Sequence, residues 1–130
     1  DLDTVMPGLA LYDFGDLVRG ATSPVAEDEL DTSKVEMRLP MFEAIVEGYL
    51  ETAANFLTPL EIDLLPFSAK LISLETGIRF LTDYLEGDQY FRVHRDNHNL
   101  DRCRTQLALV KSIENQVSKM LDFVKKWHSS

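Results

Sequence analysis

Three stretches of apolar residues at helical spacing constrain the fold of this chain more than any other feature. Between residues 40 and 57, 66 and 85, and 100 and 124, apolar side chains recur three and four positions apart. That period places them on one face of an α-helix. Because the three segments make up much of a 130-residue chain, we expect a mainly α protein in which residues 1–130 form a single domain.

Local signals predict where these helices begin and end. Pro40 suits a first turn, where the N–H that proline lacks would be unpaired. Thr58-Pro59-Leu60-Glu61 has the pattern of a capping box and starts a short helix. Gly87 is a typical stop residue for the helix before it, and Asn99 is predicted to cap the last helix. The helix over 66–85 is expected to bury the face that carries Phe67, Leu71, Leu74, Ile78, Leu81 and Leu85.

The first forty residues differ from the rest of the chain in composition and residue pattern. Residues 1–20 mix acidic and apolar residues, which predicts a short extended lead-in, a turn at Pro7-Gly8 and a short helix over 12–19. Residues 21–39 predict a polar loop. Charge blocks are usually solvated, so we expect the same of its acidic run, Glu27, Asp28, Glu29 and Asp31.

Charge and cysteine content exclude several classes of protein. The formal net charge is −9, which argues against nucleic acid as a partner and against an anionic membrane surface. No apolar stretch is long enough to span a bilayer. Cys103 is the only cysteine, so no disulfide can form within the chain, and a cytoplasmic location is expected. The acidic opening without Met suggests a fragment of a longer protein.

Two acidic motifs could carry chemistry near the start of the chain. Asp1 and Asp3 would point to the same side of an extended segment, and paired carboxylates suit Mg²⁺. An exposed acidic terminus explains the same residues, and spacing alone favours it. Asp13-Phe14-Gly15 contains the metal-binding letters of protein kinases, but no A-P-E follows. We therefore expect Asp13 to cap the next helix or to bond a neighbouring loop.

A third candidate region runs from Glu75 to Arg104. Glu75, Arg79 and Asp83 are four residues apart, which predicts two ordinary ion pairs along a helix. A dense basic and aromatic set follows, which could bind a sugar or a phosphate or could form a solvated loop. His94 and His98 lack a third ligand for zinc at the usual spacings. The set comprises Tyr90, Phe91, Arg92, His94, Arg95, His98, Arg102 and Arg104.

Several of these motifs resemble a known enzyme family. The sequence over 1–8, followed by Tyr12-Asp13-Phe14-Gly15-Asp16, resembles the segment after the catalytic loop in the aminoglycoside phosphotransferase and choline kinase superfamily. Residues 77–88 and 98–106 look like its N-acetylhexosamine 1-kinase branch, whose members are also labelled mucin desulfatases. The resemblance implies the helical C-terminal lobe of a protein-kinase-like fold. It also implies ATP-dependent phosphorylation of the anomeric hydroxyl of N-acetylglucosamine or N-acetylgalactosamine.

The resemblance also implies roles for individual residues. Asp1 would hold Mg²⁺ on the phosphates of ATP, and Asp3 would be a close second carboxylate. Asp13 would brace the catalytic loop from behind. Arg79 and Tyr90 would contact the hexosamine.

Parts that the family needs are missing from the chain. Its catalytic loop, H-N-D or H-G-D with an Asn five residues after the Asp, does not occur, nor does the nucleotide-binding lobe. We therefore expect no catalytic residue here, no kinase activity from this chain alone, and self-association through an exposed apolar face. Cys103 is followed by Arg-Thr-Gln, which does not match the sulfatase pattern C/S-x-P-x-R. Two alternatives remain: a stand-alone helical interaction domain, and the same fold acting on another sugar, choline or an aminoglycoside.

Overall fold

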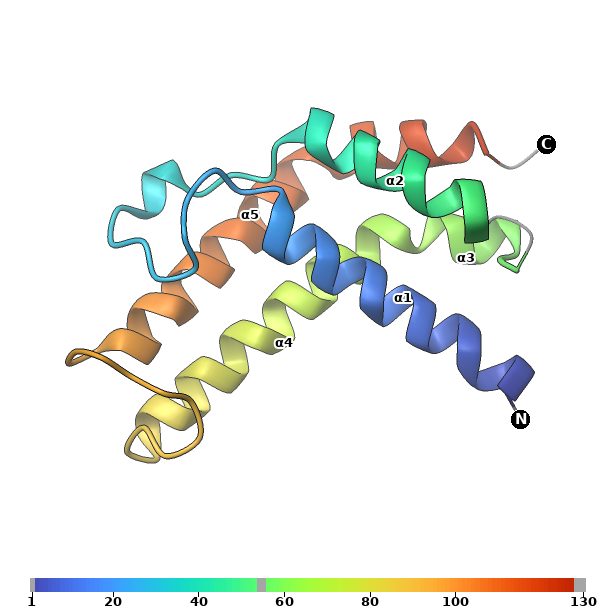
Figure 1. Ribbon diagram of the computed structural model, residues 1–130. Helices are drawn as coiled ribbons and strands as arrows, with labels where there is room; N and C mark the ends of the chain where they lie inside the picture. The colour runs from blue at the N-terminus through green and yellow to red at the C-terminus, as the bar shows by residue number, and fades with distance from the viewer. Residues whose placement is uncertain (1, 54–55, 128–130) are drawn as a thin grey trace.

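The computed structural model describes residues 2–53 and 56–127, and side chains within these ranges from residue 11 onward. Its elements are α1 (Leu2–Ala21), a 3₁₀ turn (Thr32–Lys34), α2 (Leu39–Ala53), α3 (Pro59–Asp63), α4 (Leu65–Leu85) and α5 (His98–Lys125) (Figure 1). The described residues contain no strand, so the prediction of a mainly α chain is confirmed. None of the helices in this part of the chain is long and apolar enough to cross a membrane.

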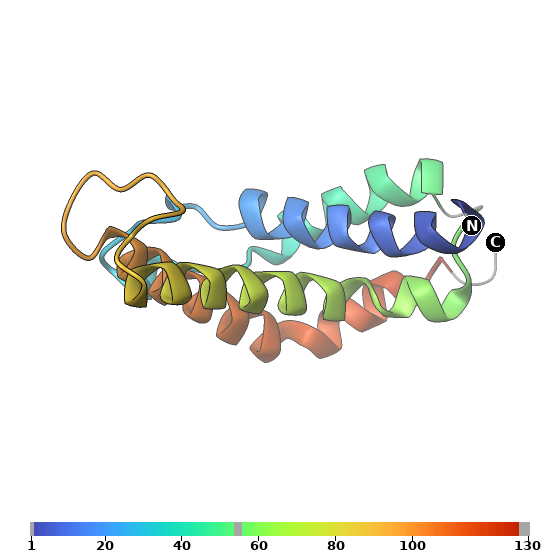
Figure 2. The same ribbon diagram turned by 90° about the horizontal axis from the view of Figure 1, so that it is seen from below.

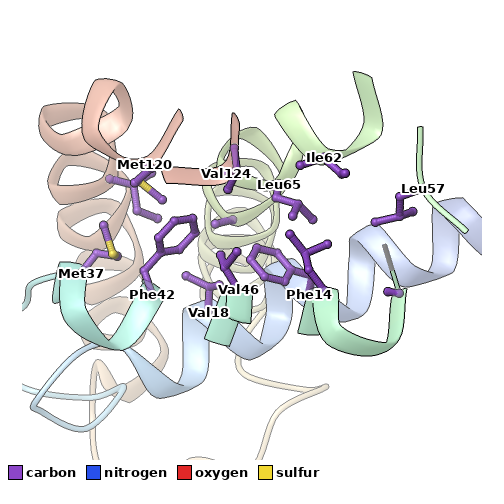
Figure 3. Packing of buried hydrophobic residues seen from close by; sticks show 14 of the residues in the cluster. Phe14, Val18, Met37, Phe42, Val46, Leu57, Ile62, Leu65, Met120 and Val124 are labelled. Atoms are coloured by element: carbon purple, nitrogen blue, oxygen red, sulfur yellow. The ribbon is translucent and has the colours of Figure 1, made fainter. Parts of the chain in front are cut away.

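The helices form two layers with the core between them. Figure 2 shows α1 and α2 in one layer and α4 and α5 in the other. The loop 86–97 joins α4 to α5 as a helical hairpin, the most extensive helix pairing in the chain. Figure 3 shows how side chains from both layers meet. Core residues that are almost wholly buried include Phe14, Val18, Phe42, Val46, Leu65, Ile113, Met120 and Val124.

The local signals for helix ends are largely confirmed. Pro40 is the second residue of α2. At the start of α3, the hydroxyl of Thr58 accepts a hydrogen bond from the N–H of Glu61 at 3.1 Å. The N–H of Thr58 in turn donates to the Glu61 carboxylate at 2.8 Å. Gly87 follows α4 with φ of +94°, a left-handed conformation that glycine adopts without steric cost.

The prediction for the lead-in is wrong. Residues 2–21 form one continuous helix with no extended segment and no turn at Pro7-Gly8. A strand needs a neighbouring strand for its N–H and C=O groups, and the described residues offer none, whereas a helix pairs these groups within itself. Because Pro7 has no N–H, the helix lacks the hydrogen bond that would reach the carbonyl of Asp3. Asp13 lies in the interior of α1 and is exposed, so it does not cap a helix.

The predicted buried face of α4 is also wrong. The face that packs on α1 and α5 carries Leu65, Ala69, Ile72, Gly77 and Phe80. The apolar residues on the opposite side mostly point outward, and exposed fractions are 52% for Phe67, 46% for Leu71 and 53% for Ile78. We call that side the outer stripe, which comprises Phe67, Leu71, Leu74, Ile78, Leu81 and Leu85.

Small side chains explain why the other face of α4 is buried. A Cβ atom placed on Gly15 of α1 would lie 2.7 Å from the carbonyl oxygen of Ser68 and 2.7 Å from Ile72 Cγ1. A Cβ atom on Gly77 would lie 3.1 Å from the Cβ of Gln106 on α5. Helices can approach this closely only where side chains are small, and the bulky outer stripe does not allow it.

The predicted cap of α5 is wrong as well. Asn97 precedes the helix with φ of 61° and makes no hydrogen bond from its side chain to the helix. Asn99 lies inside the first turn and is fully buried. Its amide nitrogen donates to Asp83 at 2.7 Å and to Asp88 at 3.0 Å. Asn99 therefore ties the two helices together instead of capping one of them.

Candidate functional site

Asp83, near the end of α4, organises the loop that follows the helix. It is only 4% exposed. One carboxylate oxygen accepts the N–H groups of Gln89 at 2.9 Å and Tyr90 at 2.7 Å. The other accepts the N–H of Phe91 at 3.0 Å and the amide of Asn99 at 2.7 Å. Four donors on one buried carboxylate tie the loop and α5 to the end of α4.

These hydrogen bonds also set the ionisation of Asp83. Burial by itself would raise the pKa of this carboxyl, because it disfavours the charged form. The N–H groups of Phe91, Tyr90 and Gln89 and the Asn99 amide act in the other direction and hold the pKa of Asp83 below its usual value. The lowered pKa favours the charged form of Asp83, which is the form that accepts these hydrogen bonds.

The ordered loop turns one aromatic ring inward and the next one outward. Phe91 packs on Phe80 of α4, with ring centroids 4.7 Å apart. Tyr90 lies against the edge of Phe91 at 4.9 Å and is 82% exposed. Arg102 of α5 donates to the carbonyl of Arg92 at 3.0 Å and lies over the Phe80 ring at 5.6 Å. The loop is thus fixed from both helices, and Tyr90 presents its ring to the exterior.

A groove lies between α4 and this loop. Its volume is about 390 Å³, within the range of small-molecule sites. Arg79 and Tyr90, the two residues that the family resemblance assigns to the hexosamine, both line it. We call it the loop groove. Its other lining residues are Ile78, Thr82, Asp83, Glu86 and Phe91.

Arg79 keeps its guanidinium available for a ligand. It pairs with Glu75 at 3.3 Å, but its side chain is 60% exposed, and such surface pairs contribute little. The ion pair predicted between Glu75 and Arg79 is thus confirmed. Asp83 accepts hydrogen bonds from three N–H groups of the loop instead of pairing with Arg79. The four-residue spacing in the sequence did not indicate this role.

Arg79 also lines a second, open cavity of about 400 Å³, to which α1, α4, α5 and the loops after α1 and α4 contribute residues. Four of its lining residues are arginines, in a chain of net charge −9. Arg19 is already engaged by Asp16 at 3.0 Å and by Glu27 at 2.8 Å. Arg102 is held by the Arg92 carbonyl. Two of these four cations therefore have structural roles, and Arg79 and Arg92 are the two others that line this cavity.

Of the two histidines noted in the connection, His98 is used in packing. His98 is the first residue of α5 and is 3% exposed. Its Nδ1 accepts the N–H of His94 at 3.1 Å, so Nε2 carries the proton and donates to Asp28 at 2.8 Å. Both ring nitrogens are thus occupied, which leaves neither for a metal. Asp28 also meets Arg95 at 3.5 Å.

Part of the acidic run is therefore structural. Hydrogen bonding to His98 and the charge of Arg95 keep the pKa of Asp28 below its usual value against the opposing effect of desolvation. The carbonyl of Glu27 accepts a hydrogen bond from Thr105, and its carboxylate pairs with Arg19. The prediction of a solvated acidic loop holds in part, since the side chains of Glu27 and Asp28 are 41% and 37% exposed. These two residues also join the end of α1 to α5, which the charge pattern did not indicate.

The predicted magnesium site finds no support among the described residues. Asp1 lies outside them, and so does the side chain of Asp3. The backbone at Asp3 is helical, and residues two apart on a helix do not face each other. In the part of the chain that the structure describes, no group of three or more His, Cys, Asp or Glu could hold a metal. The assignment of Asp1 and Asp3 to Mg²⁺ therefore stays a prediction.

Cys103 is inert in this structure. It is 4% exposed and makes no disulfide. Burial raises the pKa of its thiol, against the weaker opposing effect of Arg104. A neutral buried thiol is a poor nucleophile. The thiol therefore serves packing.

Comparison with known families does not identify the chain. No protein-family model matches the sequence. The kinase branch therefore stays a prediction that rests on the motifs, and the loop groove stays a candidate site that rests on its geometry.

Proposed function

We propose that this chain is the acceptor-binding helical part of an ATP-dependent sugar kinase that phosphorylates the anomeric hydroxyl of N-acetylglucosamine or N-acetylgalactosamine. One observation carries the proposal: Arg79 on α4 and Tyr90 on the loop line the same groove. The resemblance points to these two residues independently of their positions in space.

The chemistry of the loop groove suits a neutral amino sugar. The exposed ring of Tyr90 offers a flat apolar face on which a sugar ring can stack. The guanidinium of Arg79 can donate to hydroxyls or to an acetamide carbonyl. Glu86, on the rim, can accept hydrogen bonds from hydroxyls. Asp83 has its four acceptor contacts filled by the protein, so its role is to position Tyr90 and Phe91.

Direct binding tests the proposal. We expect N-acetylglucosamine and N-acetylgalactosamine to bind this chain with a Kd on the order of millimolar, as suits a shallow groove. Chemical shift changes in NMR titrations should centre on Arg79, Thr82 and Tyr90. Arg79→Ala and Tyr90→Ala should each weaken binding by about tenfold, since each removes one principal contact.

Arg104→Ala is the matched control for Arg79→Ala. The Arg104 side chain is 61% exposed and pairs with Asp101 at 3.7 Å, much as Arg79 is exposed and pairs with Glu75. It does not line the loop groove. Equal loss of sugar binding in both variants, or no binding by the wild-type chain, would refute the groove as the acceptor site. Tighter binding of choline or an aminoglycoside would keep the site and change the acceptor.

The proposal also predicts that the chain binds without turnover. The H-N-D or H-G-D catalytic loop is missing from the sequence. Within the described residues, no group of three or more His, Cys, Asp or Glu could hold a metal. Positioning and charge stabilisation supply nearly all of phosphoryl-transfer catalysis. We expect no ADP release above background when the chain is incubated with ATP, Mg²⁺ and N-acetylglucosamine. Turnover that follows the chain through purification would contradict this.

The second candidate function is an interaction domain without catalysis. The outer stripe favours it, because it places large apolar side chains on the surface. The two functions are compatible, since the stripe and the loop groove share only Ile78.

A further inference from the structure

The outer stripe of α4 is regular as well as exposed. Its residues are separated by four, three, four, three and four positions. Leu60 and Leu64, which are 68% and 37% exposed, continue this spacing across the junction of α3 and α4. Alternation of three and four is the heptad pattern of helices that pack along each other. A surface helix needs only one apolar face, and α4 already buries its other face against α1 and α5.

The area of the stripe is close to what a stable interface requires. With Leu60 and Leu64, it offers on the order of 700 Å² per copy, against roughly 800 Å² from each partner in a typical interface. Leu85 alone is 73% exposed. Patches on monomers rarely exceed a few hundred Å². A partner that covers this stripe would therefore gain enough buried area to bind stably.

The charges beside the stripe indicate what the partner is. In heptad positions, Leu71, Ile78 and Leu85 are a residues, and Phe67, Leu74 and Leu81 are d residues. Lys70 then occupies a g position and Glu75 the following e position. In a parallel pair of identical helices, g of one copy faces the following e of the other, so Lys70 and Glu75 would meet twice with opposite charge.

Both side chains can take part in such pairs. Lys70 contacts Glu114 at 2.9 Å and Glu75 contacts Arg79 at 3.3 Å. The four side chains are between 35% and 60% exposed, so these pairs are weak and can rearrange. No charged residue interrupts the stripe between Phe67 and Leu85.

We infer that the outer stripe is a dimerisation surface, on which α4 of a second copy of this chain packs in parallel and in register. This inference does not rest on the sugar-binding proposal, although the stripe and the loop groove share Ile78. Like residues would form the layers, with Phe67, Leu71 and Leu74 each meeting its own copy.

Sedimentation over a wide range of protein concentration tests the dimer. The wild-type chain should form dimers, and Leu71→Glu should raise the dissociation constant at least about 100-fold, because a buried like-charge pair is costly. Leu30→Glu is the control, since Leu30 is 72% exposed and lies outside the stripe. Circular dichroism should show that both variants keep their helices. A wild-type chain that stays monomeric would overturn the inference and leave the stripe to a different partner, as would a Leu71→Glu chain that dimerises normally.

A cysteine placed on the stripe tests the register. Phe67→Cys should give a disulfide-linked dimer on mild oxidation, because equivalent positions meet in a parallel pair. Leu30→Cys should not, and neither should the wild-type chain, whose Cys103 is buried. A Phe67→Cys chain that dimerises without cross-linking would overturn the parallel register.

Discussion

Replacing Gly15 by alanine is expected to destabilise the chain by about 1–3 kcal/mol, as overpacking of a tight contact does. The added Cβ would lie 2.7 Å from the carbonyl oxygen of Ser68 and 2.7 Å from Ile72. Since the carbonyl belongs to the backbone of α4, the clash cannot be relieved by rotating a side chain. The helix α1 would have to move away, and with it Phe14, which is fully buried.

Gly48→Ala is the control for this prediction. Gly48 lies within α2, and nothing lies within 4 Å of the position of its added Cβ. Alanine there should be neutral or stabilise by up to about 1 kcal/mol, because alanine has the higher helix propensity. Urea unfolding of the two variants measures both free energies. Similar values for Gly15→Ala and Gly48→Ala would mean that α1 and α4 do not cross as closely as the structure has them.

Replacing Asp83 by asparagine is expected to release the loop and to lower Tm by roughly 5–10 °C. An amide oxygen can accept only some of the four bonds. The amide N–H₂ would face either the N–H donors of Gln89 and Tyr90 or the donors of Phe91 and Asn99. Hydrogen exchange of the three loop amides should become much faster. Asp122→Asn, at an exposed position of α5, should change neither property.

The same carboxylate predicts a specific dependence on pH. The pKa of Asp83 is lowered in the folded chain, so its stabilisation is present above the unfolded value of about 3.9. It is lost as pH falls through the lower folded pKa. The stability difference between wild type and Asp83→Asn should therefore be constant from pH 7 to about 4 and shrink below it. A difference that is already lost at pH 6 would contradict the role of the charged carboxylate.

The candidate site could be predicted from residue patterns only in part. The family resemblance points to Arg79 and Tyr90, and these two residues line one groove, while their contact with a sugar stays a prediction. The sequence predicts an ion pair for Asp83, because Arg79 stands four residues before it. Only the path of the loop shows that three N–H groups converge on this carboxylate. One feature of the sequence is consistent with this role of Asp83. It is an acidic residue four positions before Gly87, where the helix ends, and backbone N–H donors follow in the turn.

The sequence alone determined the features that depend on near neighbours. Pro40, the capping box at Thr58 and the stop at Gly87 involve bonds within a few residues, so their outcome does not depend on the rest of the fold. Tertiary structure decided which face of α4 is buried, because that helix is apolar on both sides. Small residues such as Ala69 and Gly77 let α1 and α5 approach closely, so this face packs inward and the bulkier outer stripe remains on the surface.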